Sequence, residues 1–214
     1  MLASASNASR NYQAPNGLLA KTFTRPRPVT LHAAGTEIYA QGEKSGTLYR
    51  IEFGAVRIYR LLADGRRQVV AFHIAGETFG FEGGKVRSFF AECIVSSGLT
   101  TVDLDGDGRY SKDLMELALK EMGRAQKHLL VVGKQCALEK LAVFLVDLAD
   151  RQGGLDCIDI PMTRTDIGDY LGMTIETVSR NLSKLKSEGV VRLQSSRSIE
   201  IVKPERLYLL ASKL

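Results

Sequence analysis

The first half of the chain alternates between apolar and polar residues in short runs that glycines separate. The pattern extends over about residues 23–104, and it is clearest at residues 56–61 and again at residues 68–74. Asp64 and Gly65 stand between these two runs. An Asp-Gly pair between alternating runs is a strong hairpin signal, because both turn positions favour residues that tolerate a positive φ. Closely spaced short strands with glycine turns predict a β sandwich or jelly roll.

The spacing of apolar residues changes to three and four over about residues 111–134. Sustained spacing of this kind predicts a long helix with a coiled-coil seam. The seam positions are Met115, Ala118, Met122, Ala125, Leu129, Val132 and Cys136. Small alanines in the seam favour close approach of a second helix. An ordinary amphipathic helix packed on its own barrel is the alternative.

Two short helical patterns meet at Gly172 in the last quarter of the chain. Thr163 followed three residues later by Asp166 predicts a capping box at the start of the first helix, with Asp in place of the usual Glu or Gln. Gly172 is suited to the left-handed conformation that ends a helix, and Thr174 to capping the next one. Two helices joined by a short turn that contains glycine predict a helix-turn-helix, whose second helix enters the major groove of DNA.

The segments around this motif complete a small domain. The sequence predicts an amphipathic helix over residues 137–151, a short strand over residues 157–160 and a closing helix over residues 204–214. Residues 190–201 contain two short apolar runs that pair plausibly as a hairpin, with Arg197 in the loop between them. Such a hairpin after a recognition helix predicts a wing that contacts phosphates and carries no sequence information.

The residues that point away from the apolar side of the second helix are candidates for contact with DNA bases. They are Ile175, Glu176, Ser179 and Arg180. Arginine binds guanine O6 and N7, glutamate accepts from cytosine N4, and an apolar side chain can meet a thymine methyl. An exposed ion pair between Glu176 and Arg180, four residues apart, is the alternative. The expected phosphate contacts are Thr163, Arg164, Thr174, Thr177 and Arg197.

Composition narrows the class of protein. The chain has 214 residues, of which 44% are apolar and 25% charged, as in a globular protein of one large or two modest domains. The net charge is +5, and residues 161–214 contribute +3 through nine Lys or Arg against six Asp or Glu, which suits a polyanionic partner. No apolar run approaches the roughly 18 residues that span a bilayer, and no signal peptide pattern opens the chain. We therefore expect a cytoplasmic protein without a membrane partner.

The helix-turn-helix resembles a known family. Residues 163–172 read T-R-T-D-I-G-D-Y-L-G and residues 176–180 read E-T-V-S-R. This text is similar to the CRP/FNR family of bacterial transcription regulators, and the E-T-V-S-R form to the branch that includes FNR and the FixK-type regulators and binds TTGA half-sites. By that resemblance Glu176, Ser179 and Arg180 contact bases. Ile175 stands where the cyclic-AMP-binding branch usually has arginine, which disfavours that branch's operator.

The alternating region also resembles this family, through G-T-E-I-Y-A-Q-G-E at residues 35–43 and A-F-H-I-A-G-E-T-F-G-F-E at residues 71–82. The resemblance implies an α+β fold with an N-terminal cyclic-nucleotide-binding-type β jelly roll, a long dimerisation helix and a C-terminal winged helix-turn-helix. The expected divisions are a flexible tail over residues 1–21, the barrel over residues 22–109, the dimerisation helix over residues 110–136 and the DNA-binding domain over residues 137–214.

We expect the barrel to bind no cofactor. Nucleotide-binding members hold the cyclic phosphate with an Arg-Ser pair, and Arg87-Ser88 lies in the matching region. However, G-F-E-G-G at residues 80–84 departs from the G-E-L segment of those members. A four-iron cluster needs four thiolates, and the chain has only Cys93, Cys136 and Cys157. His32, His73 and His128 lack paired spacing, and no metal-ligand or catalytic constellation appears, so we expect neither a metal site nor an enzyme.

The resemblance implies a homodimer that presents two recognition helices about one DNA turn apart and therefore binds an inverted repeat. The expected operator is TTGA-N6-TCAA-like, and the expected partners are double-stranded DNA, a second copy of the chain and RNA polymerase. Family members of this branch activate oxygen-limitation, denitrification or nitrogen-fixation genes. The alternative is a sensor whose barrel binds a cyclic nucleotide or haem and thereby switches DNA binding.

Overall fold

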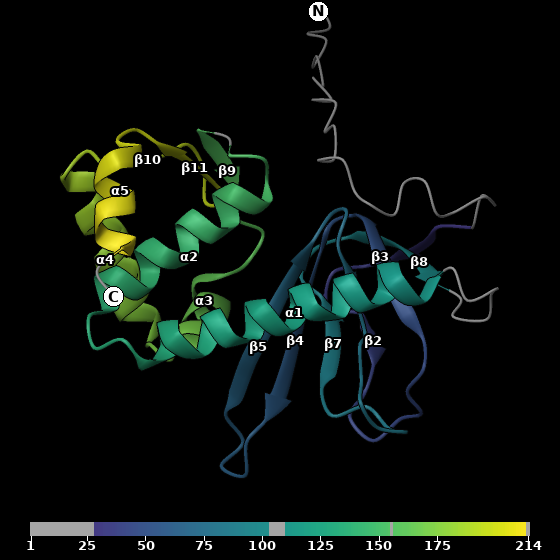
Figure 1. The fold of residues 1–214 in the computed structure, drawn as a ribbon. Helices are drawn as coiled ribbons and strands as arrows, with labels where there is room; N and C mark the ends of the chain where they lie inside the picture. The colour runs from purple at the N-terminus through teal and green to yellow at the C-terminus, as the bar shows by residue number, and fades with distance from the viewer. Residues whose placement is uncertain (1–27, 103–109, 155, 213–214) are drawn as a thin grey trace, which may run out of the picture.

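The structure is a computed structural model that describes residues 28–102, 110–154 and 156–212. The expected tail, the first residues of the expected barrel and its boundary at residue 109 lie outside the described residues. Figure 1 shows a β barrel and a smaller, mostly helical domain, with one long helix that crosses the barrel and ends beside the smaller domain. This arrangement confirms the α+β fold that the resemblance implies.

The barrel consists of two antiparallel four-stranded sheets, with strand orders β1-β8-β3-β6 and β2-β7-β4-β5. The strands are β1 Thr30–His32, β2 Glu37–Tyr39, β3 Leu48–Phe53, β4 Ala55–Leu61, β5 Arg67–Ile74, β6 Thr78–Phe79, β7 Phe90–Cys93 and β8 Ser97–Val102. Strands β4 and β5 pair directly, with Val56 opposite His73. The predicted hairpin is confirmed, and Gly65 adopts a φ of 81° in its turn. The inward residues Ile51, Val56 and Phe79 are almost fully buried in the core between the sheets.

Two helices follow the barrel: α1 (Tyr110–Gly133) and α2 (Ala137–Arg151). The predicted long helix and the predicted amphipathic helix are therefore confirmed. Cys136 does not lie on α1, because the helix ends at Gly133 and Cys136 is the extended residue that precedes α2. The assignment of Cys136 to the seam was wrong. Regular apolar spacing continues across residues 134–136, and spacing alone cannot show that the backbone turns there.

The C-terminal domain packs a helix-turn-helix between α2 and a small sheet. Its other elements are β9 Cys157–Asp159, α3 Arg164–Leu171, α4 Ile175–Ser187, β10 Val191–Leu193, β11 Ser198–Ile201 and α5 Pro204–Ala211. The sheet has the order β10-β11-β9, and Val191 lies opposite Ile201 in the predicted wing hairpin. Leu145, Ile167 and Leu185 are fully buried where α2, α3 and α4 meet. This shared core fixes the angle between the two helices of the motif.

Candidate nucleic-acid interface

Helix α3 begins with the predicted capping box. The Oγ of Thr163 accepts the backbone N–H of Asp166 at 3.1 Å. In return, Oδ2 of Asp166 accepts the backbone N–H of Thr163 at 3.0 Å and its hydroxyl at 2.7 Å. Both donors of Thr163 are therefore engaged within the protein. The phosphate contact expected at Thr163 is not supported, because its hydroxyl holds the start of α3 in place.

The turn between α3 and α4 depends on two glycines. Gly172 ends α3 in the left-handed conformation, with a φ of 65°. A Cβ on Gly168 would lie 2.6 Å from the carbonyl oxygen of Met173, so the turn backbone passes directly over this glycine. Thr174 then caps α4, and its Oγ accepts the backbone N–H of Thr177 at 3.3 Å. The result is a short, closely packed turn that leaves the start of α4 at the protein surface.

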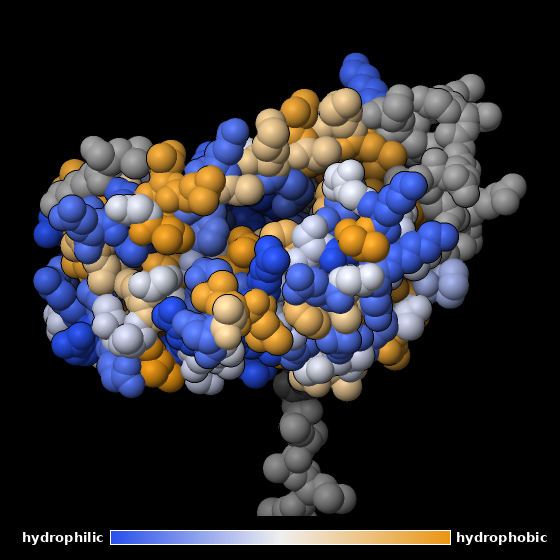
Figure 2. Space-filling model, turned by 90° about the horizontal axis from the view of Figure 1, so that it is seen from below, coloured by the Kyte–Doolittle hydropathy of each residue, from blue (hydrophilic) through white to orange (hydrophobic). Residues whose placement is uncertain are grey.

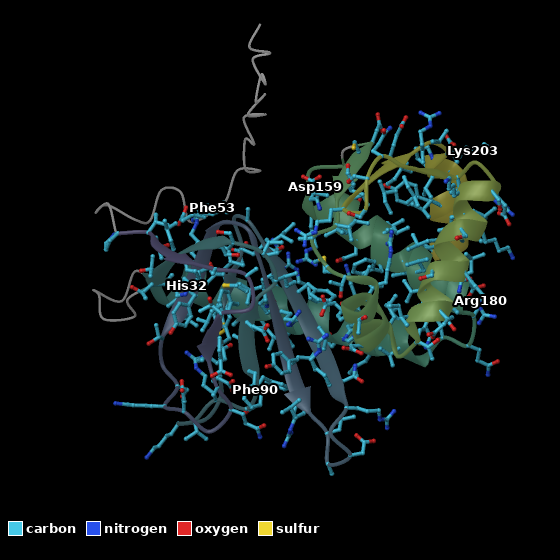
Figure 3. The ribbon with its side chains drawn as sticks, turned by 180° about the vertical axis from the view of Figure 1, so that it is seen from behind. His32, Phe53, Phe90, Asp159, Arg180 and Lys203 are labelled. Carbon is cyan, nitrogen blue, oxygen red and sulfur yellow. The ribbon has the colours of Figure 1, made fainter. Side chains whose placement is uncertain are left out.

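Helix α4 divides into a buried side and an exposed side, as predicted. Its buried residues are Val178, Leu182 and Leu185. All four predicted base-contact residues are exposed: Ile175, Glu176, Ser179 and Arg180. Figure 3 shows Arg180 on the side of the domain that is remote from the barrel. The exposed side of α4 therefore carries an arginine, a carboxylate, a hydroxyl and an apolar group, which are the chemical types that distinguish base pairs in the major groove.

Glu176 and Arg180 remain separately available on this surface. Within the described part of the chain no ion pair joins them, and Nη2 of Arg180 instead donates to Oγ of Thr177 at 3.3 Å. Hydrogen bonds from its own backbone N–H and from Thr174 lower the pKa of Glu176. Glu176 is thus an ionised acceptor at neutral pH, as a contact with the amino group of cytosine requires.

The remaining phosphate candidates lie around α4. Thr174 and Thr177 sit at its N-terminus, where backbone N–H groups and the helix dipole favour an anion. Arg164, in the first turn of α3, is half-buried, and that burial lowers the pKa of its guanidinium. Arg197 is exposed in the wing, where its backbone N–H donates to Oγ of Ser195 at 3.1 Å.

Comparison with known proteins agrees with this geometry. The family model of the Crp-like helix-turn-helix domain matches residues 139–210, and that of the cyclic nucleotide-binding domain matches residues 30–107. The chain is 54% identical over 182 residues to the nitrogen fixation regulation protein FixK of Rhizobium meliloti (strain 1021), covering 85% of this chain and 86% of that protein. It is 32% identical to the transcriptional activatory protein AadR of Rhodopseudomonas palustris, over 82% of this chain and 77% of that protein. The solved structure of FixK2 from Bradyrhizobium japonicum superposes with a TM-score of 0.83 at 34% identity, covering 89% of this chain and 100% of that one.

The chain belongs to the CRP/FNR family of transcription regulators. It is therefore a FixK-like DNA-binding regulator and not an enzyme. None of the described helices combines the length and the apolar character needed to cross a membrane.

In this CRP/FNR regulator, α1 presents an apolar surface that is left exposed by the residues that the structure describes. We call it the α1 stripe; it consists of Met115, Leu119, Met122, Leu129 and Leu130, which are between 52% and 72% exposed. The stripe and the predicted seam share Met115, Met122 and Leu129. Ala118 and Val132 are instead half-buried, and Ala125 is exposed at the edge of a cavity beside the barrel.

Leu119 and Leu130 were missed by the sequence reasoning. The helix has adjacent apolar faces, and the spacing 118-122-125-129-132 combines residues from both of them. A signal for the exposed face was nevertheless present, since Leu119 lies four residues after Met115 and three before Met122. Which face turns outward depends on what packs against α1, and the sequence pattern does not contain that information.

Arg87 and Ser88, which lie in the region where nucleotide-binding members hold the cyclic phosphate, have partners within the barrel. Arg87 is only 2% exposed, and its guanidinium donates to the carbonyl oxygens of Gly80 at 2.6 Å and Thr47 at 2.5 Å. Ser88 donates its backbone N–H and its hydroxyl to the carboxylate of Glu82, at 3.0 and 3.1 Å. The Glu82 carboxylate thus occupies the two donors of Ser88, and backbone carbonyl oxygens occupy Nη1 and Nη2 of Arg87.

A cavity of about 330 Å³ lies between the barrel and the DNA-binding domain. Figure 2 shows the molecule hollowed between these two parts when it is seen from below. Aromatic side chains such as Phe79, Phe89 and Phe144 line it together with charged groups from α1 and α2.

Charged groups beside this cavity form ion pairs between the barrel, α1 and α2. Glu77, just before β6, accepts hydrogen bonds from Arg124 of α1 at 2.7 Å and from Arg151 of α2 at 2.7 and 3.0 Å. Burial acts to raise the pKa of Glu77, but the neighbouring positive groups, chiefly the Arg151 guanidinium, together outweigh it and lower the pKa to about 2. Burial also lowers the pKa of the neighbouring His73 to about 4. His73 is therefore a neutral buried side chain at pH 7.

The three cysteines and the other histidines are dispersed. Cys93 is buried in the barrel, Cys136 is exposed before α2 and Cys157 lies in β9. His128 stacks on Tyr170 with 3.9 Å between ring centroids, and His32 lies on β1. Across the residues that the structure describes, no group of three or more potential ligands could hold a metal ion.

Proposed function

We propose that this regulator binds TTGA-N6-TCAA-like inverted repeats as a homodimer and activates transcription through RNA polymerase. The observation that carries the proposal is the exposed side of α4. The exposure of these side chains supports contact of Arg180 with the guanine of a TTGA half-site, of Glu176 with a cytosine amino group on the complementary strand, and of Ile175 with a thymine methyl. Arg164, Thr174, Thr177 and Arg197 then supply contacts to phosphates.

The α1 stripe supports a dimer. Five large apolar side chains on one side of a 24-residue helix are costly to leave in water, and a second copy of α1 would bury them. Two-fold symmetry then places two copies of α4 about one helical turn apart on DNA, which requires an inverted repeat.

The names of two relatives support the biological setting. One is called a nitrogen fixation regulation protein and the other a transcriptional activatory protein. We infer that this chain activates genes for oxygen-limited growth, denitrification or nitrogen fixation in the cytoplasm. The engagement of Arg87 and Ser88 by groups of the barrel supports DNA binding without a cyclic nucleotide.

Gel-shift binding of the protein, without added ligand, to a TTGA-N6-TCAA duplex tests the proposal. A TGTGA palindrome serves as the competitor. We expect nanomolar binding to the first duplex and weak competition by the second. Equal affinity for both duplexes would contradict the operator assignment. A reporter gene downstream of the operator then distinguishes activation from repression.

The cavity between the barrel and the DNA-binding domain favours a second candidate, in which a small ligand binds there and switches DNA binding. Calorimetry with cyclic nucleotides and a visible absorption spectrum of the purified protein test it. DNA binding that appears only after addition of cyclic AMP or haem would favour this function over the first.

A further inference from the structure

Asp166 is a fully buried carboxylate with two distinct sets of partners. Its Oδ2 closes the capping box with Thr163 at the start of α3. Its Oδ1 accepts Nη1 of Arg57 at 2.9 Å and Nη2 of Arg67 at 2.7 Å. The side chain has 0% exposure, and a carboxylate in such a place is tolerable only when charges and hydrogen bonds compensate it. Both arginines are therefore needed to compensate the buried charge of Asp166.

The two arginines belong to the barrel, 109 and 99 residues before Asp166 in the chain. Arg57 lies on β4 and is held from its other side by Glu92 of β7 at 2.5 Å. Arg67 lies at the start of β5 and also binds Asp169 of α3, at 2.8 Å. We call Arg57, Arg67, Glu92, Asp166 and Asp169 the Asp166 cluster. Through it the β4–β5 hairpin holds the first helix of the DNA-binding motif, and Figure 1 shows α3 beside β5.

Helix α1 contacts the C-terminal end of α3, opposite the end that the Asp166 cluster holds. Nε2 of His128 lies 2.8 Å from the carbonyl oxygen of Tyr170, and the two rings stack in parallel. Helix α3 is thus held near its start by the hairpin and near its end by the helix that carries the α1 stripe. Because α3 and α4 share a buried core, any rotation of α3 also moves the surface that contacts bases.

We propose that Arg57 and Arg67, acting through Asp166, are positioning residues for DNA recognition. They fix the orientation of the helix-turn-helix relative to the barrel and α1 of the same chain. In that orientation, both recognition helices of a dimer contact one operator. The proposal rests on the proposed dimeric binding to an inverted repeat. Built-in ion pairs between the barrel and the DNA-binding domain would then fix the orientation without a bound effector.

Arg67→Gln is the variant that tests this role, and Arg66→Gln is its matched control. Arg66 is the adjacent residue of the same hairpin, but it pairs with Asp64 inside the turn and is exposed. The probes are the operator with its 6-base-pair spacer, the same half-sites with spacers one base pair shorter and longer, a single half-site and unrelated DNA. The operator is the sequence that the wild-type protein selects from random DNA.

We expect Arg67→Gln to bind the intact operator about tenfold more weakly and to discriminate less between spacers, while its affinity for a single half-site is unchanged. Arg66→Gln should behave as the wild-type protein does. Arg67→Lys should recover only part of the loss, because an ammonium group cannot bridge Asp166 and Asp169 as a guanidinium does. Asp169→Asn removes only the half-exposed ion pair and should cause a smaller change in the same direction.

Two results would overturn the positioning role. One is unchanged affinity and spacer preference in Arg67→Gln and Asp169→Asn. The other is an equal loss on operator, half-site and unrelated DNA together with a lower melting temperature, which indicates general destabilisation. If the wild-type protein selects no inverted repeat at all, the proposed function fails first, so the two failures are distinguishable.

Discussion

Truncation of Arg180 is the sharpest test of the recognition surface, because this side chain contributes little to folding. Arg180 is exposed, and its guanidinium makes a single 3.3 Å hydrogen bond to the half-buried Thr177. Surface substitutions of this kind change stability within about 0.5 kcal/mol. Arg180→Ala should therefore melt like the wild-type protein, and any change in DNA binding reports on recognition.

The loss of affinity follows from the number of contacts. A bidentate contact between arginine and guanine discriminates against other bases by about 1–3 kcal/mol. A dimer uses two copies of Arg180, so the full operator should lose about 2–6 kcal/mol, or at least about 30-fold in affinity. Fluorescence anisotropy at one fixed salt concentration measures this loss. Operators with each base pair in turn at the guanine position should then differ less in their affinity for Arg180→Ala than for the wild-type protein, because only Glu176 still contacts that base pair.

Arg197→Ala is the control for this experiment. Its exposed side chain in the wing should contact only phosphate, so all sequences should lose affinity alike. The slope of log affinity against log salt should become shallower by about one for each wing. The reasoning about Arg180 is refuted if Arg180→Ala loses as much affinity for random DNA as for the operator, or if the variant distinguishes guanine as strongly as the wild-type protein does.

Three further predictions concern assembly and stability. Leu129→Glu places a charge in the α1 stripe and should yield monomers with weak operator binding in sedimentation and gel-shift assays, whereas Lys120→Glu on another side of α1 should remain dimeric. Folding lowers the pKa of His73 from 6.5 to about 4, so the unfolded chain binds a proton at a higher pH than the folded chain does. The free energy of unfolding should therefore fall as the pH drops from 6.5 towards 4, by about 2 kcal/mol at pH 5. Urea titrations should show this slope, and His73→Phe should flatten it; an unchanged slope would show that other groups cause it. Gly168→Ala should lower the melting temperature and DNA affinity, because its Cβ would press on Met173, whereas Gly123→Ala meets nothing within 4 Å and should stabilise α1 by about 1 kcal/mol.

The sequence alone determined most of the local structure of the DNA-binding motif. The capping box of Thr163 and Asp166, the left-handed Gly172 and the buried side of α4 were all predictable, because each depends on residues within one or two helical turns. The β4–β5 hairpin was predictable for the same reason, since its turn residues and alternation are adjacent in the chain. The resemblance to the CRP/FNR family supplied the arrangement of the whole molecule.

Only the tertiary structure decided which contacts form between residues that lie far apart in the chain. It placed Leu119 and Leu130 on the outer side of α1, because the barrel and α3 cover the other side. In the folded barrel the guanidinium of Arg87 donates hydrogen bonds to backbone carbonyl oxygens of other segments. The tertiary structure also gave Asp166 a second role, since the arginines that neutralise this carboxylate come from strands about a hundred residues earlier in the chain. Local spacing cannot encode such pairings, because they depend on which surfaces the completed fold brings together.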